Sequence, residues 1–173
     1  MIADEKSPTR ISHRSFATSR SEMRISMEII KGGVTAAKGF CAAGLNAGIK
    51  NNEKKDMAMV YSEKPCVTAG TFTTNKVFAA PVKWDKDIVA NSPFAQAVVV
   101  NSGVANACTG KEGDDACAAE AKAVSEALQV PESAVLVAST GVIGAQLPMD
   151  KICAGIKELP KKLGSSLEHG TLA

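Results

Sequence analysis

The amino-acid sequence predicts one compact domain of mixed α and β structure. The chain has 173 residues, of which 45% are hydrophobic, and this suits a single domain of roughly 100–200 residues with its own core. Short apolar or alternating runs within residues 57–101, bounded by Asn, Asp, Gly and Pro, predict strands. Later segments carry apolar residues at helical spacing. Helices packed on a sheet are therefore expected.

The predicted strands come first along the chain. They are residues 57–62, 66–73, 80–85 and 95–101, which are flanked by residue types that favour turns. A further strand is expected within residues 130–139, where the apolar run VLVA leads into Ser139.

Two helices are expected on either side of that last strand. In residues 113–129 the apolar side chains fall on one helical face, at Cys117, Ala121, Val124 and Leu128. A second helix begins around Pro148, and the same spacing joins Ile152, Ile156, Leu159 and Leu163. Pro160 should end or kink this helix, because proline has no N–H for the helical hydrogen bond.

Composition narrows the classes of partner. Lys and Arg number 20 against 18 for Asp and Glu, and outside residues 1–31 the two signs balance at 14 each. This argues against nucleic acid, whose binding requires clustered positive charge. With five cysteines, no C-x-x-C pair and two histidines, no metal site is expected. Small molecules are the expected partners.

The cysteines are interpreted as small apolar residues of a protein in a reducing compartment. The alternative is a catalytic thiol. Cys108 is the best candidate for it because this residue sits in a polar loop, but the sequence places neither His13 nor His169 beside it.

Residues 1–28 differ in character from the rest and are interpreted as a disordered or leader extension, with the fold in residues 29–173. Residues 7–24 are rich in Arg, Ser and Thr, which is typical of an organelle transit peptide, although nearby acidic residues dilute the pattern. No apolar run approaches the roughly 20 residues that cross a bilayer. The expected protein is soluble and cytoplasmic, or mitochondrial or plastid if residues 1–26 are a transit peptide.

Several polar segments could form either a binding site or a turn. Residues 98–110 place polar side chains after an apolar strand, at Asn101, Ser102, Asn106 and Thr109. Such residues often bond their own backbone in loops, but they also suit a substrate pocket. Residues 72–82 and 32–40 leave the same choice open. Residues 109–113 do not complete the pattern of a phosphate-binding loop.

The segment STGVIG, residues 139–144, is the strongest candidate site. An apolar run ends there on a hydroxyl and a glycine, and glycine allows a ligand to approach the backbone closely. Acyl transfer develops negative charge on a carbonyl oxygen, and each preset donor around that oxygen contributes about 3–4 kcal/mol. The hydroxyl of Thr140 and the N–H of Gly141 are two such donors. The alternative is a simple turn.

Four segments together resemble the ornithine acetyltransferase family, also called bifunctional glutamate N-acetyltransferases. They are GGVTAAKGF, FTTNKVFAAPV, VVVNSGVANACTG and VLVASTGVIG, in this order. The resemblance runs from about residue 30 to the end of the chain. It implies the N-terminal part of a self-cleaving α+β fold, in which layered sheets are covered by helices.

The resemblance also implies a reaction of arginine biosynthesis, in which an acetyl group moves from N-acetylornithine to glutamate through an acetylated threonine. Such proteins cleave themselves at an Ala-Thr bond, and the freed threonine heads the second chain as nucleophile. The family's oxyanion hole carries over to Thr140 and Gly141. No cofactor is implied, although some members accept acetyl-CoA as a co-substrate.

The family's substrate-binding threonine and lysine and its cleavage site lie downstream of the last residue of this chain. We therefore expect an incomplete first (alpha) chain that is inactive alone and pairs with a missing beta chain, in a heterotetramer of two alpha and two beta chains. The alternatives are an amide hydrolase of the self-cleaving aminopeptidase type, which would use the same donors, and a non-catalytic metabolite-binding module.

Overall fold

The computed structural model describes residues 27–92 and 94–173. The leader and transit-peptide interpretations of residues 1–26 fall outside this part of the chain. Residues 27–30 are exposed and belong to no helix or strand.

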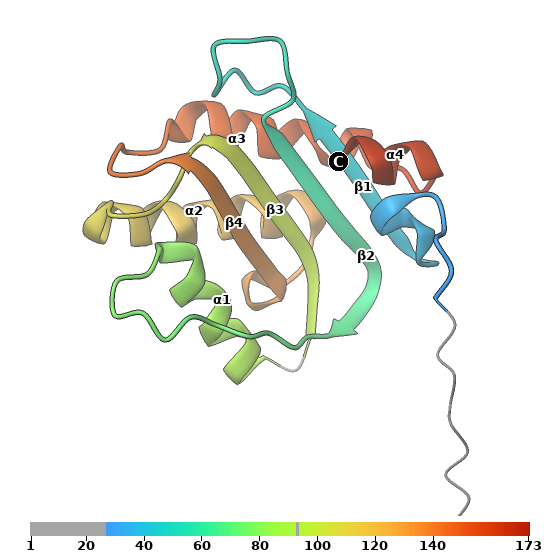
Figure 1. Ribbon diagram of the computed structural model, residues 1–173, viewed down its shortest axis with the longest axis horizontal. Helices are drawn as coiled ribbons and strands as arrows, with labels where there is room; N and C mark the ends of the chain where they lie inside the picture. The colour runs from blue at the N-terminus through green and yellow to red at the C-terminus, as the bar shows by residue number, and fades with distance from the viewer. Residues whose placement is uncertain (1–26, 93) are drawn as a thin grey trace, which may run out of the picture.

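The described strands form one mixed sheet with the order β1-β2-β3-β4 (Figure 1). The strands are β1 (Phe40–Leu45), β2 (Met57–Val67), β3 (Phe94–Val104) and β4 (Val135–Val142). The first three pair antiparallel, whereas β3 and β4 are parallel. A parallel pair needs a crossover connection, and the helix between β3 and β4 provides it. Strand β4 is consequently an edge strand.

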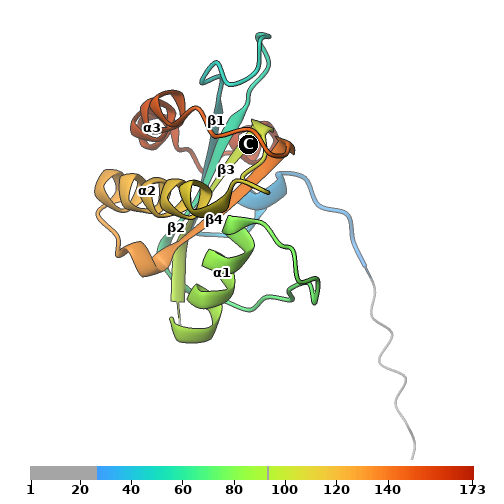
Figure 2. The same ribbon diagram turned by 90° about the vertical axis from the view of Figure 1, so that its left-hand side faces the viewer.

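The α-helices are α1 (Ala80–Asn91), α2 (Gly110–Leu128), α3 (Met149–Glu158) and the short α4 (Leu167–Leu172). In the described part of the chain they are accompanied by the 3-10 turns η1 (Gly33–Ala36), η2 (Glu132–Ala134) and η3 (Pro160–Lys162). Figure 2 shows α2 and α3 on the same side of the sheet, with α1 below them beside β4. Helix α4 packs near β1 and η1.

The core lies between the sheet and the α2–α3 layer. Alternate residues of the strands point toward these helices, and the residues buried there include Ala97, Val99, Val135, Val137, Cys117, Ala121, Val124, Ile152 and Ile156. The intervening residues of β3, such as Val98 and Val100, are only partly buried. The sheet therefore has one face covered by α2 and α3 and one face that these helices leave open.

The prediction of both helices is confirmed. Helix α2 contains the expected face and starts three residues earlier than residue 113. Helix α3 ends at Glu158, and Pro160 opens the 3-10 turn that follows. Strand β4 overlaps the strand expected within residues 130–139, but η2 precedes it and the strand continues through Ser139 to Val142.

The prediction of a strand at residues 80–85 is wrong, because this segment is the first half of α1. Pro81 lies in the first turn of that helix, where the missing N–H has no helical partner to lose. Pro81 and Ile88 are buried, and Trp84 lies four residues before Ile88 on the same side of the helix. Residues 80–85 span less than two helical turns, which is too short a segment to show the helical repeat.

Two further differences concern the early strands. Residues 57–62 belong to one long strand that reaches Val67, with a register shift between Tyr61 and Cys66, while residues 68–73 form no regular strand. Pro65 lies within this interruption, as expected of a residue that cannot donate to a sheet ladder. Strand β1 was not predicted, since its sequence FCAAGL carries no β-branched residue.

Candidate functional site

The candidate residues Thr140 and Gly141 lie next to each other near the end of edge strand β4. Both residues are exposed. In the register of the sheet Thr140 pairs with Ser102 and Gly141 with Gly103. The strand thus carries them beyond the last core residue, Val137, to a rim that the described residues leave accessible.

The backbone of β4 alternates between its paired side and its free edge. The carbonyl of Val142 accepts a hydrogen bond from the N–H of Ala105 on the β3 side, at 2.8 Å. The N–H of Val137 instead bonds a side chain of α1. Because backbone groups of every second residue share a direction, the N–H of Gly141 points outward with that of Val137. Outside the pairing of the strands, no described group accepts a hydrogen bond from it.

Gly141 occupies a conformation that other residues adopt only with strain. Its φ is +131°, within the range that favours glycine. A Cβ at this position would also meet the carbonyl carbon and oxygen of Gly103 on the neighbouring strand. Glycine therefore permits both the backbone conformation and the close approach of β3 and β4.

The side chains of Ser139 and Thr140 lie on opposite faces of the sheet. Ser139 Oγ accepts a hydrogen bond from the N–H of Asn106 at 2.9 Å and donates one to the carbonyl of Val104 at 3.1 Å. Thr140 has no such partner among the described residues, and strand alternation puts it on the face that α2 and α3 leave open. An exposed hydroxyl and an outward N–H are thus adjacent in the chain.

The polar segment 98–110 is held mostly by its own local hydrogen bonds. Thr109 donates to Asn106 Oδ1 at 2.6 Å, and Asn106 Nδ2 donates to the carbonyl of Gly113 at 2.8 Å. Both side chains are buried. They connect the end of β3 to the start of α2, as the turn interpretation predicts. Asn101 is also buried, and its Oδ1 has no partner among the described residues.

Residues 72–82 likewise begin with local turn contacts. The N–H of Asn75 donates to Thr73 Oγ1, and the N–H of Val77 donates to Asn75 Oδ1, both at 3.1 Å. In residues 32–40, Thr35 donates to the carbonyls of Gly32 and Ser166. These contacts tie the chain together, and they do not converge on Thr140.

Among residues 27–92 and 94–173, no contact joins a cysteine to a histidine. Cys117 is buried in the core, where burial, foremost, raises the pKa of its thiol to about 12. Cys108 is exposed. His169 Nδ1 lies 2.6 Å from Ser166 Oγ, and no described contact joins Cys108 to His169. No cluster of metal-binding side chains exists among residues 27–92 and 94–173.

Three carboxylates that the sequence did not single out, Asp56, Glu120 and Asp85, are wholly or partly buried. Asp56 is buried and accepts hydrogen bonds from the N–H groups of Ala47, Ile49 and Lys50 at 2.6–2.9 Å, which fixes the loop between β1 and β2. Glu120 is completely buried in α2, and neither of its oxygens has a partner among the described residues.

Burial raises the pKa of Glu120 to about 8. Burial also raises the pKa of Asp85, the third carboxylate, to about 6, against the opposing hydrogen bond from Val137. The sequence gives no signal that Asp85 faces inward, because residues 80–85 are predicted as a strand. Glu120 does carry such a signal, since it lies three residues after Cys117 and four before Val124 on the predicted apolar face of α2.

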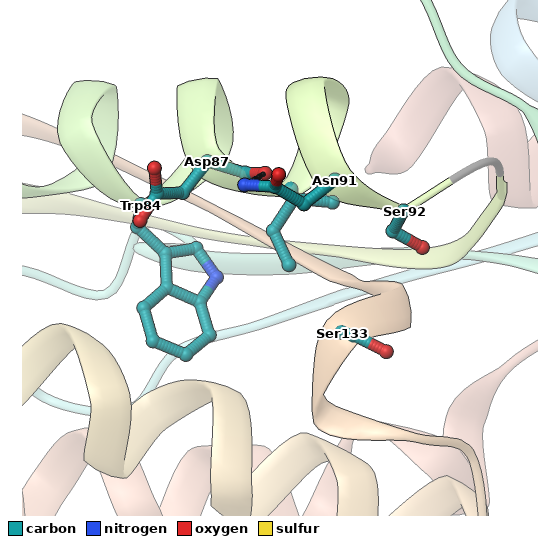
Figure 3. A pocket seen from close by; sticks show the side chains of 6 residues that line it. Trp84, Asp87, Asn91, Ser92 and Ser133 are labelled. Carbon is teal, nitrogen blue, oxygen red and sulfur yellow. Dashed lines mark hydrogen bonds between the residues drawn. The ribbon is translucent and has the colours of Figure 1, made fainter.

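One cavity near β4 lies away from the candidate site. It has a volume of about 480 Å³ and is lined by residues of α1 and η2, including Trp84, Ile88 and Ser133. Figure 3 shows Trp84 extending from α1 on the side toward η2, with Asp87 and Asn91 along the same helix. This cavity lies beside the start of β4, whereas Gly141 is about 20 Å further along at roughly 3.3 Å per residue.

Within the described part of the chain, none of the helices combines the length and apolar character required to span a membrane.

Comparison with known proteins identifies relatives over most of the chain. The model of the ArgJ family matches residues 41–172. The arginine biosynthesis bifunctional protein ArgJ of Gloeobacter violaceus is 52% identical over 125 residues, which are 72% of this chain and 31% of that protein. The ArgJ protein of Caldanaerobacter subterraneus is 47% identical over 84% of this chain and 37% of its own length. The chain thus spans about a third of these curated relatives.

Two solved structures share the fold. ArgJ from Bacillus halodurans superposes with a TM-score of 0.76 and 44% identity, over 80% of this chain and 71% of that chain. Ornithine acetyltransferase from Mycobacterium tuberculosis, solved in complex with ornithine, gives a TM-score of 0.79 and 43% identity, over 82% and 76% of the two chains. The predicted α+β class and the predicted family are both confirmed.

Proposed function

The chain belongs to the ArgJ family, and from this membership we propose that it is the N-terminal part of an enzyme that transfers an acetyl group from N-acetylornithine to glutamate. The names of the relatives support arginine biosynthesis as the pathway, and a relative with the same fold binds ornithine. The nucleophile in this proposal is a threonine in the part of the protein outside this chain.

The role we propose for this chain is to stabilise the oxyanion. When the threonine hydroxyl attacks the acetyl carbonyl carbon, the carbonyl oxygen gains negative charge, and donors aimed at it lower the barrier. The supporting observation is that Thr140 and Gly141 are adjacent and exposed near the end of edge strand β4, where strand alternation directs the N–H of Gly141 toward the free edge. The hydroxyl of Thr140 and this N–H are the donors.

The proposed reaction consists of two acyl-transfer steps, and neither step requires a cofactor. Collapse of the first intermediate breaks the amide C–N bond, ornithine leaves as the amine, and the acetyl group stays on the threonine oxygen. The amine of glutamate then attacks this ester, the C–O bond breaks, and the threonine hydroxyl is restored. An N-terminal threonine can use its own amine as the base. Acetyl-CoA is a second acetyl donor that the same site could accept.

We also propose that this chain pairs with a beta chain, as a heterotetramer of two alpha and two beta chains in the cytoplasm. The share of the relatives' length outside this chain supports a partner segment, and the bacterial relatives are compatible with the location. The end of β4 at Thr140, Gly141 and Val142 is exposed, which is consistent with a chain that adds further structure there.

The test is acetyl exchange by the whole gene product. N-Acetylornithine labelled in the acetyl group is incubated with glutamate, and the products are separated. Labelled N-acetylglutamate supports the proposed transfer. Labelled acetate without N-acetylglutamate would instead identify an amide hydrolase, and binding without either product would identify a metabolite-binding module.

A further inference from the structure

Helix α1 lies along the free edge of β4 and hydrogen-bonds part of it (Figure 1). Trp84 Nε1 donates to the carbonyl of Val135 at 2.9 Å, and Asp85 Oδ1 accepts from the N–H of Val137 at 3.0 Å. Both backbone groups would otherwise be open to a further strand. The side chains of α1 therefore take the place of a neighbouring strand over the first half of this edge.

A third contact of α1 supports β4 at Ser139, two residues after Val137. The N–H of Ala80, the first residue of α1, donates to the carbonyl of Asn106 at 3.2 Å. The N–H of Asn106 in turn donates to Ser139 Oγ at 2.9 Å. Helix α1 thus holds β4 directly at Val135 and Val137, and indirectly at Ser139. No described side chain bonds the next two residues, Thr140 and Gly141.

We infer that Asp85 is a positioning residue for the oxyanion donors, because its hydrogen bond to Val137 fixes the edge of β4 just before Thr140 and Gly141. This inference rests on the proposed function of these two residues. Asp85 touches neither donor, and it acts through the backbone of the strand that carries them.

The requirement for such support follows from the site's place at a sheet edge. A strand with neighbours on both sides is held by two ladders, whereas β4 has only β3. A misplacement of about 1 Å in a catalytic group can cost about a hundredfold in rate. A carboxylate is a stronger acceptor than a neutral oxygen, and above a pH of about 6 Asp85 is charged. Its bond to Val137 is then at its strongest.

The test compares Asp85→Ala, Asp85→Asn and the control Asp87→Ala in the whole gene product, at a pH well above the pKa of Asp85. Asparagine keeps an oxygen that can accept the N–H of Val137, whereas alanine removes it. Asp87 lies on the same helix, is exposed and makes no side-chain hydrogen bond to β4. Two quantities are measured: hydrogen exchange in the peptide that covers residues 135–142, and kcat and KM for acetyl transfer.

We expect Asp85→Ala to accelerate exchange in residues 135–142 and to lower kcat about tenfold with KM nearly unchanged, within the range that misplacement produces. Asp85→Asn should restore most of the slow exchange in residues 135–142 and most of the parent kcat. Asp87→Ala should leave the exchange and kcat unchanged. Unchanged exchange in Asp85→Ala, or faster exchange with an unchanged kcat, would overturn the inference. If Asp85→Ala does not fold, Trp84→Phe tests the same support, since it removes the bond to Val135 and reduces the ring that packs against the core; an unchanged exchange rate in residues 135–142 and an unchanged kcat would then overturn the inference.

The variant Thr140→Ala separates this inference from the proposed function. If it transfers acetyl groups at the parent rate, the oxyanion role is wrong. If Thr140→Ala is impaired while Asp85→Ala retains the parent kcat, the oxyanion role stands and only the positioning role of Asp85 fails.

Discussion

Replacing the buried Glu120 by Gln should make the protein more stable, and the gain should increase with pH. The side chain of Glu120 is fully buried with both oxygens unpartnered in the described structure, so its ionised form is strongly disfavoured. Glutamine has nearly the same shape and cannot ionise. The substitution therefore removes the cost of the charge and leaves the packing of α2 in place.

The magnitude follows from the pKa of this carboxyl group, which burial raises from 4.5 to about 8. The folded pKa lies above the unfolded one, so the folded state holds its proton where the unfolded state has lost it. Stability is then unaffected below a pH of about 4.5 and falls as the pH rises toward 8, by about 1.4 kcal/mol per pH unit. The loss between about pH 5 and pH 7.5 is roughly 3 kcal/mol.

The assay is urea unfolding of the chain, followed by circular dichroism at several values between about pH 5 and pH 7.5. The free-energy difference between Glu120→Gln and the parent should grow over this range. Glu126→Gln is the matched control, since Glu126 is exposed on the same helix. The thiols of Cys117 and Cys153 interact with Glu120, but burial raises the pKa of both, and neither titrates in this window.

A difference between Glu120→Gln and the parent that stays constant over the whole pH range would refute this reasoning. It would mean that Glu120 titrates alike in the folded and unfolded states. The same conclusion would follow if Glu126→Gln reproduced the pH dependence.

The other predictions concern the site, its support and the isolated chain. Thr140→Ala in the whole gene product should slow acetyl transfer by about a hundredfold or more while circular dichroism stays unchanged; transfer at the parent rate would make Thr140 a turn residue only. Gly141→Ala should lower stability by about 2 kcal/mol or more in urea unfolding, because φ is +131° there. Asp56→Ala should cost about 2–3 kcal/mol, since several N–H groups lose their acceptor, and Asp56→Asn should cost less. The 173-residue chain alone should show no acetyl transfer, because the proposed nucleophile lies outside it, and turnover above background would contradict this assignment.

Helix α2 and helix α3 were predictable because each has a long apolar face with a regular repeat. Helix α1 was not, since Val82 and Trp84 alternate with Lys83 and Asp85 as in a strand, whereas the helical repeat becomes visible only with Ile88, which lies outside residues 80–85. To assign this segment to a helix, one must know that its apolar side packs against the edge of β4. Such a tertiary contact leaves no local pattern in the sequence.

The sequence singles out the candidate residues but does not predict their setting. The hydroxyl and glycine of Thr140 and Gly141 were identified by their chemistry and by family resemblance, and the role proposed for them remains a prediction. The sequence did not reveal that both lie within an edge strand, because periodicity does not specify strand order. It also did not reveal Asp85 as a neighbour, since Asp85 lies 52 residues before Val137 in the chain.

The packing at Gly141 restricts how this protein can vary during evolution. A Cβ at residue 141 would meet main-chain atoms of Gly103, whereas one at Gly155 would meet the side chains of Met57 and Ala47. A larger residue at 155 can be accommodated by a second, compensating substitution that shortens a neighbour. No such substitution exists for residue 141, because every amino acid at 103 presents the same carbonyl group. In any descendant that keeps the pairing of β3 with β4, every amino acid other than glycine at position 141 carries a cost in stability, independent of the reaction.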